Sequence, residues 1–170
     1  MNDRMLYTVT RTGLLLAVTL LLQGIRLLLP IPPQVSMFLI GSLVNACLIL
    51  AVLKVGWKSG LVVACITPVF AWLEGMLPFL PFIIPVAVGN SVLVGAVYRL
   101  RAYKLPGVYG AAVCKMAAIY GAFYLLFGCV EFPAAVRHMI LMSMSWPQLV
   151  TGVLGGTIAY RIAGRIHSSR

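Results

Sequence analysis

The stretch Ser36–Leu53 reads SMFLIGSLVNACLILAVL and contains no charged residue. It is followed at once by the short basic segment Lys54-Val55-Gly56-Trp57-Lys58. A helix needs ~20 apolar residues to cross the ~30 Å hydrocarbon core of a bilayer. Inside that core its backbone groups must be hydrogen-bonded within the helix itself. The stretch is therefore predicted to be a transmembrane helix that ends in a turn at the membrane surface.

Similar apolar stretches occur on both sides of this one, separated by basic or proline-containing breaks such as Pro30-Ile31-Pro32-Pro33-Gln34. The pattern predicts an all-α polytopic membrane protein, a compact bundle of six transmembrane helices in a single integral membrane domain, 1–170. The predicted helices are 10–29, 36–53, 59–76, 82–99, 106–128 and 146–164. For 129–145, Pro133 can begin a short helix that either lies at the surface or dips into the fold.

The overall composition excludes several classes of protein. Apolar residues make up 62% of the 170-residue chain and charged residues 9%, which is too little charge for a water-soluble surface. There is no Walker-type Gly-Lys-Ser/Thr motif, so ATP hydrolysis by this chain is not expected. The net charge of +10 does not indicate nucleic-acid binding, because the basic residues are scattered at predicted helix ends.

The distribution of basic residues predicts the orientation in the membrane. Cytoplasmic segments of membrane proteins carry an excess of Lys and Arg. With both termini cytoplasmic, the internal side holds ten of the thirteen basic residues, and the external side holds Arg26, Arg137, Glu74 and Glu131. The ten internal residues are Arg4, Arg11, Lys54, Lys58, Arg99, Arg101, Lys104, Arg161, Arg165 and Arg170. This asymmetry favours a multi-pass membrane protein with both termini in the cytoplasm.

Small residues recur at four-residue spacing in two of the predicted helices. They are Gly13 and Ala17 in the first, and Gly152 and Gly156 in the last. Such rows let helices approach closely in lipid. For the last helix, packing within the fold is the preferred interpretation. For the first, a partner protein could use the row because it lies in the cytoplasmic half.

Polar side chains in apolar stretches are the candidate ligand contacts, because leaving them unpaired in lipid costs free energy. Arg26 and Glu74 lie near outer helix ends, where they either pair with each other or line an external pocket. Lys115 is too deep to reach the cytoplasm, so it lines a polar cavity or contacts another subunit. The predicted ligand-binding residues are Arg26, Gln34, Glu74, Asn90, Trp146 and Gln148. Asn45 is interpreted as a contact between helices.

No arrangement of residues points to catalysis. Asp3 is the last aspartate, and the two histidines, His138 and His167, are predicted to lie in different compartments. No His-Glu pair has the spacing of metal ligands. We therefore predict that the chain is not an enzyme and has no catalytic residues, no metal site and no cofactor.

The chain resembles the substrate-binding S components of energy-coupling factor (ECF) vitamin transporters. Thr12-Gly13-Leu14-Leu15-Leu16-Ala17 is similar to the Ala-x-x-x-Ala signature of that family, with glycine in the first place. Trp146-Pro147-Gln148-Leu149 is similar to the family's Pro-Gln-Leu-rich last helix, and Thr67-Pro68 and Gly89-Asn90 also resemble members of the group. The resemblance covers nearly the whole chain.

The resemblance implies a function. Members capture a vitamin or other micronutrient in a pocket open to the outside. They then associate with a transmembrane coupling protein and two cytoplasmic ATPase subunits, and topple in the membrane to release the ligand inside. The resemblance makes Gly13 and Ala17 the expected contacts to the coupling protein. A non-transport membrane scaffold, with a filled interior and no small ligand, is the alternative.

Overall fold

The fold was obtained as a computed structural model that describes residues 3–28 and 32–167. Every regular element among these residues is a helix, which confirms the predicted all-α class. In chain order the elements are α1 (Asp3–Leu28), α2 (Pro33–Lys54), α3 (Trp57–Leu73), the 3-10 helix η1 (Leu80–Phe82), α4 (Ile83–Leu100), the 3-10 helix η2 (Arg101–Tyr103), α5 (Lys104–Cys129), α6 (Ala134–Ser143) and α7 (Trp146–His167).

Local sequence explains where the helices begin and end. Pro33 is the first residue of α2, a position where its missing N–H is not needed for a helical hydrogen bond. Gly56 has a φ of 142° and lets the chain turn directly from α2 into α3. α3 ends at Leu73, earlier than the predicted 76, and Gly75 follows with a φ of 71°. Pro133 precedes α6, so 129–145 contains the short helix expected there, and none of its residues is buried.

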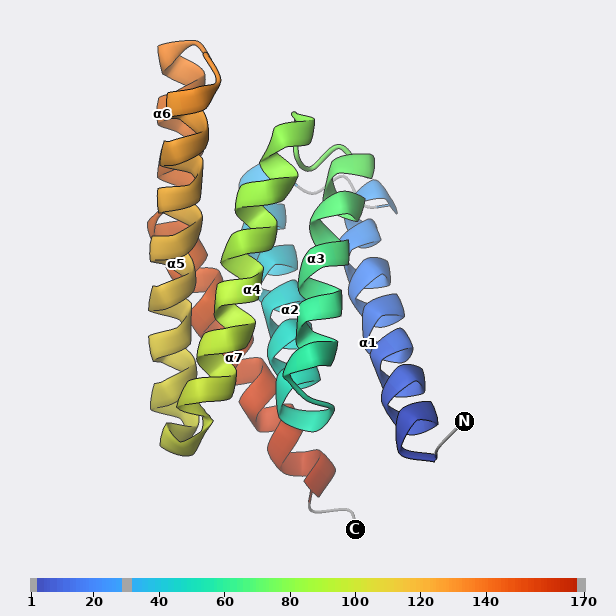
Figure 1. Ribbon diagram of the computed structural model, residues 1–170. Coiled ribbons are helices and arrows are strands. Elements are labelled where there is room, and N and C mark those ends of the chain that lie inside the picture. The colour runs from blue at the N-terminus through green and yellow to red at the C-terminus, as the bar shows by residue number, and fades with distance from the viewer. Residues whose placement is uncertain (1–2, 29–31, 168–170) are drawn as a thin grey trace.

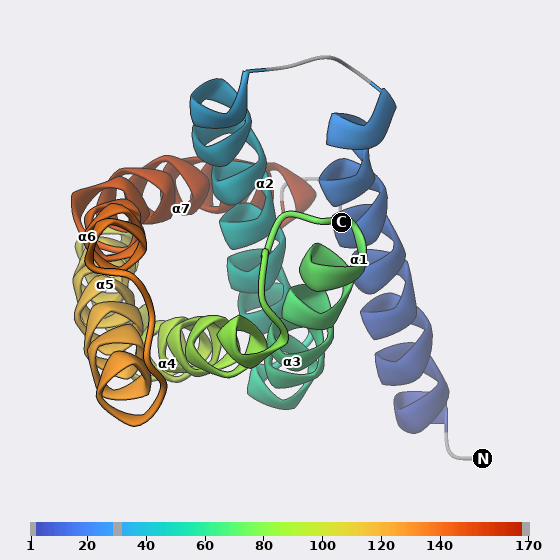
Figure 2. The ribbon, with the colours of Figure 1, turned by 90° about the horizontal axis from the view of Figure 1, so that it is seen from above.

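The long helices α1, α2, α3, α4, α5 and α7 alternate in direction (Figure 1). Seen along the bundle, α2, α3, α4, α5 and α7 form a closed ring, and α1 packs outside it against α2 and α3 (Figure 2). The start of α1 and the end of α7 lie at the same end of the bundle (Figure 1). The short α6 folds back beside the last turns of α5.

The basic residues gather at the end that holds the start of α1, the end of α7 and the α2–α3 and α4–α5 turns. We call this the basic end. It contains all the predicted cytoplasmic basic residues that the structure describes: Arg4, Arg11, Lys54, Lys58, Arg99, Arg101, Lys104, Arg161 and Arg165. Arg170 lies outside the described residues, as do positions 30 and 31 of the proline-rich break. The positive-inside pattern seen in the sequence thus corresponds to one end of the folded bundle.

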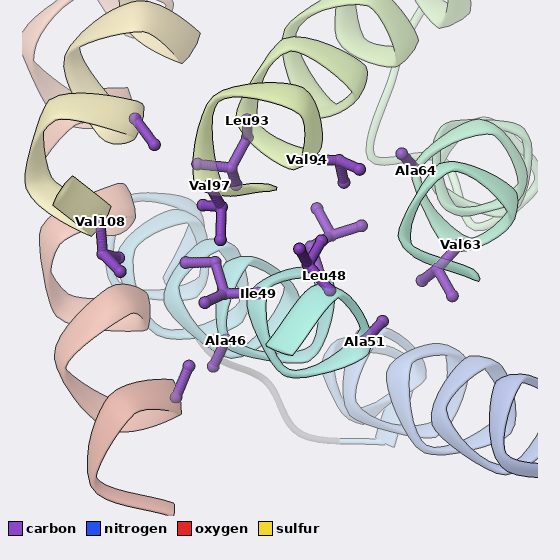
Figure 3. Close-up of a cluster of buried hydrophobic side chains, with 13 residues drawn as sticks. Ala46, Leu48, Ile49, Ala51, Val63, Ala64, Leu93, Val94, Val97 and Val108 are labelled. Carbon is purple, nitrogen blue, oxygen red and sulfur yellow. The ribbon is translucent and has the colours of Figure 1, made fainter. Parts of the chain in front are cut away.

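A tightly packed apolar core fills the half of the bundle nearer the basic end. Leu48 and Ile49 of α2 meet Leu93 and Val94 of α4, and each of these side chains is at most 1% exposed (Figure 3). In a bilayer, close packing rather than removal of apolar surface from water holds such helices together. The core therefore depends on the fit between side chains.

Glycines let α7 approach α2 and α5. A Cβ atom added at Gly152 would lie 2.7 Å from the Cβ of Ala112, and one at Gly156 would lie 2.5 Å from a methyl group of Val108. At Gly155 it would collide with the backbone oxygen of Ser42. The interpretation of the α7 glycines as internal packing residues is therefore confirmed.

Several helices could cross a membrane on length and composition alone. Among the described residues they lie in three stretches: Asp3–Leu28, Pro33–Lys54, and Leu80–Cys129, which contains α4 and α5. The shorter α3 is also apolar. The number of membrane crossings remains a prediction of six.

We expect Lys58→Cys and Lys104→Cys to react with membrane-impermeant maleimide only from the cytoplasmic side. Both positions are exposed at the basic end, and positive segments are retained inside. Both substitutions are made in a protein that lacks the native cysteines, because three of them are exposed and would also react. The native cysteines are Cys47, Cys65, Cys114 and Cys129, of which the last three are exposed. Glu131→Cys, in the exposed connection between α5 and α6 at the opposite end, is the control that should react from outside. Labelling of either lysine position from outside would contradict the predicted orientation.

Candidate functional site

A cavity of about 390 Å³ lies in the half of the bundle away from the basic end. Small-molecule sites in proteins typically measure ~300–1,000 Å³. The cavity is lined by the last turns of α1 and α3, α2 from its start to its middle, the first half of α4, the middle of α5, the α3–α4 connection, and the region where α6 joins α7. Every long helix of the bundle therefore contributes to one site.

The floor of the cavity is a polar layer centred on Lys115. This side chain is 4% exposed. Its Nζ donates hydrogen bonds to Asn45 Oδ1 at 2.6 Å and to Asn90 Oδ1 at 2.9 Å. The three residues come from α5, α2 and α4. The apolar core begins directly below them, because Ala46 and Leu93 are already part of it.

A further hydrogen bond fixes the orientation of Asn45. Its Nδ2 donates to Thr151 Oγ1 of α7 at 3.2 Å, and Thr151 Oγ1 donates to the backbone oxygen of Gln148 at 3.1 Å. Rotating the Asn45 amide by half a turn would place its NH₂ group against the ammonium of Lys115. The network therefore holds the amide oxygen toward the lysine.

The wall formed by α1 and the start of α2 carries polar atoms without partners. Gln23 Nε2 donates to the backbone oxygen of Thr67 at 3.1 Å. Gln23 Oε1 and Ser36 Oγ are buried and have no hydrogen-bond partner in the part of the chain that the structure describes. An unpaired buried polar atom costs ~1–3 kcal/mol. Both residues line the cavity, so these atoms are available to a bound molecule.

Arg26 and Glu74 lie near the outer edge of the same wall. Arg26 lines the cavity, and Glu74 is the half-buried residue that caps the C-terminus of α3. The opposite charges of Arg26 and Glu74 lie near enough to interact. The carboxyl group of Glu74 therefore compensates part of the positive charge of Arg26.

The remaining lining is mostly apolar. Phe82 is 1% exposed and packs edge-to-face on Phe123, with ring centroids 5.1 Å apart. Ile40, Ile119 and Met144 complete the apolar surface around it. The site can therefore hold a molecule with an uncharged body and a small number of polar groups.

Comparison with known proteins agrees with this architecture. The chain matches the family described as "ECF transporter, substrate-specific component" over residues 7–166. It belongs to that family. No curated protein and no solved structure gave a significant match. The family consists of membrane-embedded transporter components rather than enzymes, so the bundle is that of a polytopic membrane protein with a role in transport.

The structure of this S component brings together three of the six predicted ligand-binding residues. Arg26, Asn90 and Gln148 line the cavity. Glu74 lies beside Arg26 but is not part of the lining. Gln34 is exposed in the first turn of α2. Trp146 is 55% exposed at the start of α7, with its ring 5.8 Å from that of Phe38.

Other cavity residues of the S component were not among those six. Lys115 lines the cavity, which is the first of the two roles considered for it. Asn45 does join helices, but it does so at the cavity floor. Gln23 was missed, although it lies one helical turn before Arg26 and so on the same face of α1. That spacing is the signal by which it could have been found.

The small-residue row of α1 lies on a different surface. Gly13 and Ala17 are exposed, and a Cβ atom added at Gly13 would have nothing within 4 Å. Thr19 and Gln23 are the buried residues of α1. The row of this S component therefore faces away from the described part of its own bundle, unlike the glycines of α7.

Proposed function

We propose that this chain is the substrate-binding subunit of an ECF-type importer in the bacterial plasma membrane. It captures a vitamin or related micronutrient from outside and delivers it inward with a transmembrane coupling protein and two cytoplasmic ATPase subunits. The observation that carries the proposal is the cavity, in which Arg26, Asn90 and Gln148 converge with Lys115. A membrane scaffold would need no such space, so the cavity favours binding over the scaffold alternative.

The position of the cavity supports capture from outside. The cavity lies in the half of the bundle away from the basic end. If the basic residues are retained in the cytoplasm, the cavity opens toward the external face. The packed core between it and the basic end then closes the inward path. Release to the inside therefore requires a movement of the whole subunit, which the coupling protein and ATPases would drive.

The exposed row on α1 supports the proposed partner. Gly13 and Ala17 leave a shallow surface where a second helix can approach the α1 backbone closely. α1 is also the least buried of the candidate membrane spans. We propose that this surface docks on the coupling protein.

Alanine at Asn90 is expected to weaken ligand binding at least ~10-fold, because hydrogen bonds to or beside charged groups contribute ~1.5–3 kcal/mol. Gln148→Ala should have a smaller effect in the same direction. The measurement is equilibrium binding of a panel of radiolabelled B vitamins to the purified chain in detergent. Gln34→Ala is the matched control, since this amide is exposed outside the cavity. Unchanged affinity in folded Asn90→Ala and Gln148→Ala proteins would place the ligand elsewhere.

A further inference from the structure

Among the residues that the structure describes, no acidic side chain pairs with Lys115. The sequence contains three acidic residues, Asp3, Glu74 and Glu131. Asp3 is in the first turn of α1, at the basic end, and Glu131 is exposed in the connection between α5 and α6. Glu74 lies beside Arg26 and is not part of the cavity lining. Lys115 is buried, with 4% of the residue exposed.

Two amide oxygens do not compensate such a charge. A buried charged group is costly unless it is paired with an opposite charge and fully hydrogen-bonded. The ammonium has three N–H donors, and Asn45 Oδ1 and Asn90 Oδ1 accept two of them. The third donor is left for an acceptor in the cavity, which Lys115 lines.

From this geometry we infer that the ligand carries a carboxylate that pairs with Lys115 at the cavity floor; the inference rests on the proposed function. One carboxylate oxygen accepts the remaining N–H of Lys115. The amide nitrogen of Asn90 forms no hydrogen bond within the described residues, so it can donate to the second oxygen. The opposite end of the molecule lies near Arg26, Gln23 and Ser36.

The surroundings favour a monocarboxylate over a phosphate. At the cavity floor one ammonium balances one negative charge. Arg26 lies near the outer edge, so the second charge of a phosphate monoester bound at the floor would remain uncompensated next to Ile40, Phe82 and Ile119. The apolar lining also requires that the rest of the molecule be largely uncharged. The substrate class is therefore a small vitamin-like acid with a single carboxylate and an uncharged body.

The test uses pairs of molecules that differ only at the carboxylate: nicotinate and nicotinamide, biotin and biotinamide, pantothenate and panthenol. Thiamine, riboflavin and pyridoxine complete the panel as cationic or neutral probes. Binding is measured by equilibrium dialysis on the purified full chain in detergent. The wild-type protein should bind one acid at least ~30-fold more tightly than its neutral partner, the scale of a buried charge pair.

Lys115→Met should remove that preference, because methionine is unbranched and nearly as long as lysine but carries no charge. The folded state should survive, because the cost of burying an unpaired charge is removed together with the two hydrogen bonds to Asn45 and Asn90. Arg137→Met is the control: it removes an exposed cation of α6 that does not line the cavity, so the preference for the acid should persist. Asn90→Asp, which supplies an internal carboxylate to Lys115, should abolish binding of the acid while the protein stays folded.

The outcomes separate this inference from the proposed function. Tight binding of thiamine, riboflavin, pyridoxine or any neutral partner in preference to the acids would overturn the carboxylate assignment and leave vitamin capture intact. An acid preference that persists in folded Lys115→Met would also overturn it. If the wild-type chain retains no member of the panel, the proposed capture of a vitamin fails, and the carboxylate inference fails with it.

Discussion

Replacing Gly155 with leucine is expected to prevent the chain from folding. A Cβ atom at this position would collide with the backbone oxygen of Ser42, and it would lie 2.7 Å from Asn45 Cβ and 2.9 Å from the backbone nitrogen of Ala46. Two of these three atoms belong to the backbone of α2, which cannot move aside as a side-chain tip can. Overpacking of a tight core lowers the free energy of unfolding by ~1–3 kcal/mol or more. For Gly155→Leu we expect a loss of about 3 kcal/mol or more.

The damage should extend to the cavity, because the same stretch of α2 carries Asn45 and hence the hydrogen bond to Lys115. Thermal unfolding and size-exclusion chromatography in detergent measure the effect. Gly95→Leu is the matched control, since a Cβ there would meet nothing within 4 Å and the position is exposed on α4. A Gly155→Leu protein that elutes as a single species with an unchanged melting temperature would show that α2 and α7 are not packed as described.

Tryptophan at Gly13 is expected to block assembly with the coupling protein while leaving the isolated subunit intact. The position has open space around it within the fold, so a large side chain disturbs no internal contact. Against a partner helix the same indole would force the two backbones apart. Loss of such a close contact should weaken assembly by ~2 kcal/mol or more, the scale of an interface hot spot. Ala17→Trp, one turn further on, should behave in the same way.

The experiment compares two readouts on the same protein. Pull-down of the coupling protein and ATPase subunits reports assembly, and vitamin binding to the purified subunit reports the cavity. Val113→Trp, on the exposed surface of α5, is the control for a bulky residue facing lipid. Parallel loss of assembly and vitamin binding in Gly13→Trp would mean that the row supports the fold, and full assembly would mean that the partner docks elsewhere.

Much of the architecture follows from local properties of the chain. The all-α class could be predicted because long stretches such as Ser36–Leu53 lack charged residues, and in a membrane only a helix satisfies the backbone of such a stretch locally. The clustering of Arg4, Lys54, Arg99 and Arg161 at one end also follows from the sequence. When successive helices run in opposite directions, every second connection between them lies at the same end of the bundle. This holds however the helices pack against one another.

The cavity floor required the tertiary structure. Asn45, Asn90 and Lys115 are separated by 45 and 25 positions along the chain, counted between successive residues, and no periodicity relates residues on different helices. Only the rotation of each helix about its axis decides whether an amide meets the lysine or faces lipid, and packing against the neighbouring helices sets that rotation. The sequence could show that Lys115 needed polar surroundings, but not which residues would supply them.

The two small-residue rows show the same difference between what the sequence determines and what the tertiary structure decides. By itself the sequence determined that Gly13 and Ala17 share a face, as do Gly152 and Gly156, because residues four apart lie one helical turn from each other. It could not determine which face is covered. The α7 row lies in the closed ring against α5, and the α1 row lies on the one long helix outside that ring (Figure 2). Helical periodicity is a property of a single segment, whereas burial depends on which other segments pack against it.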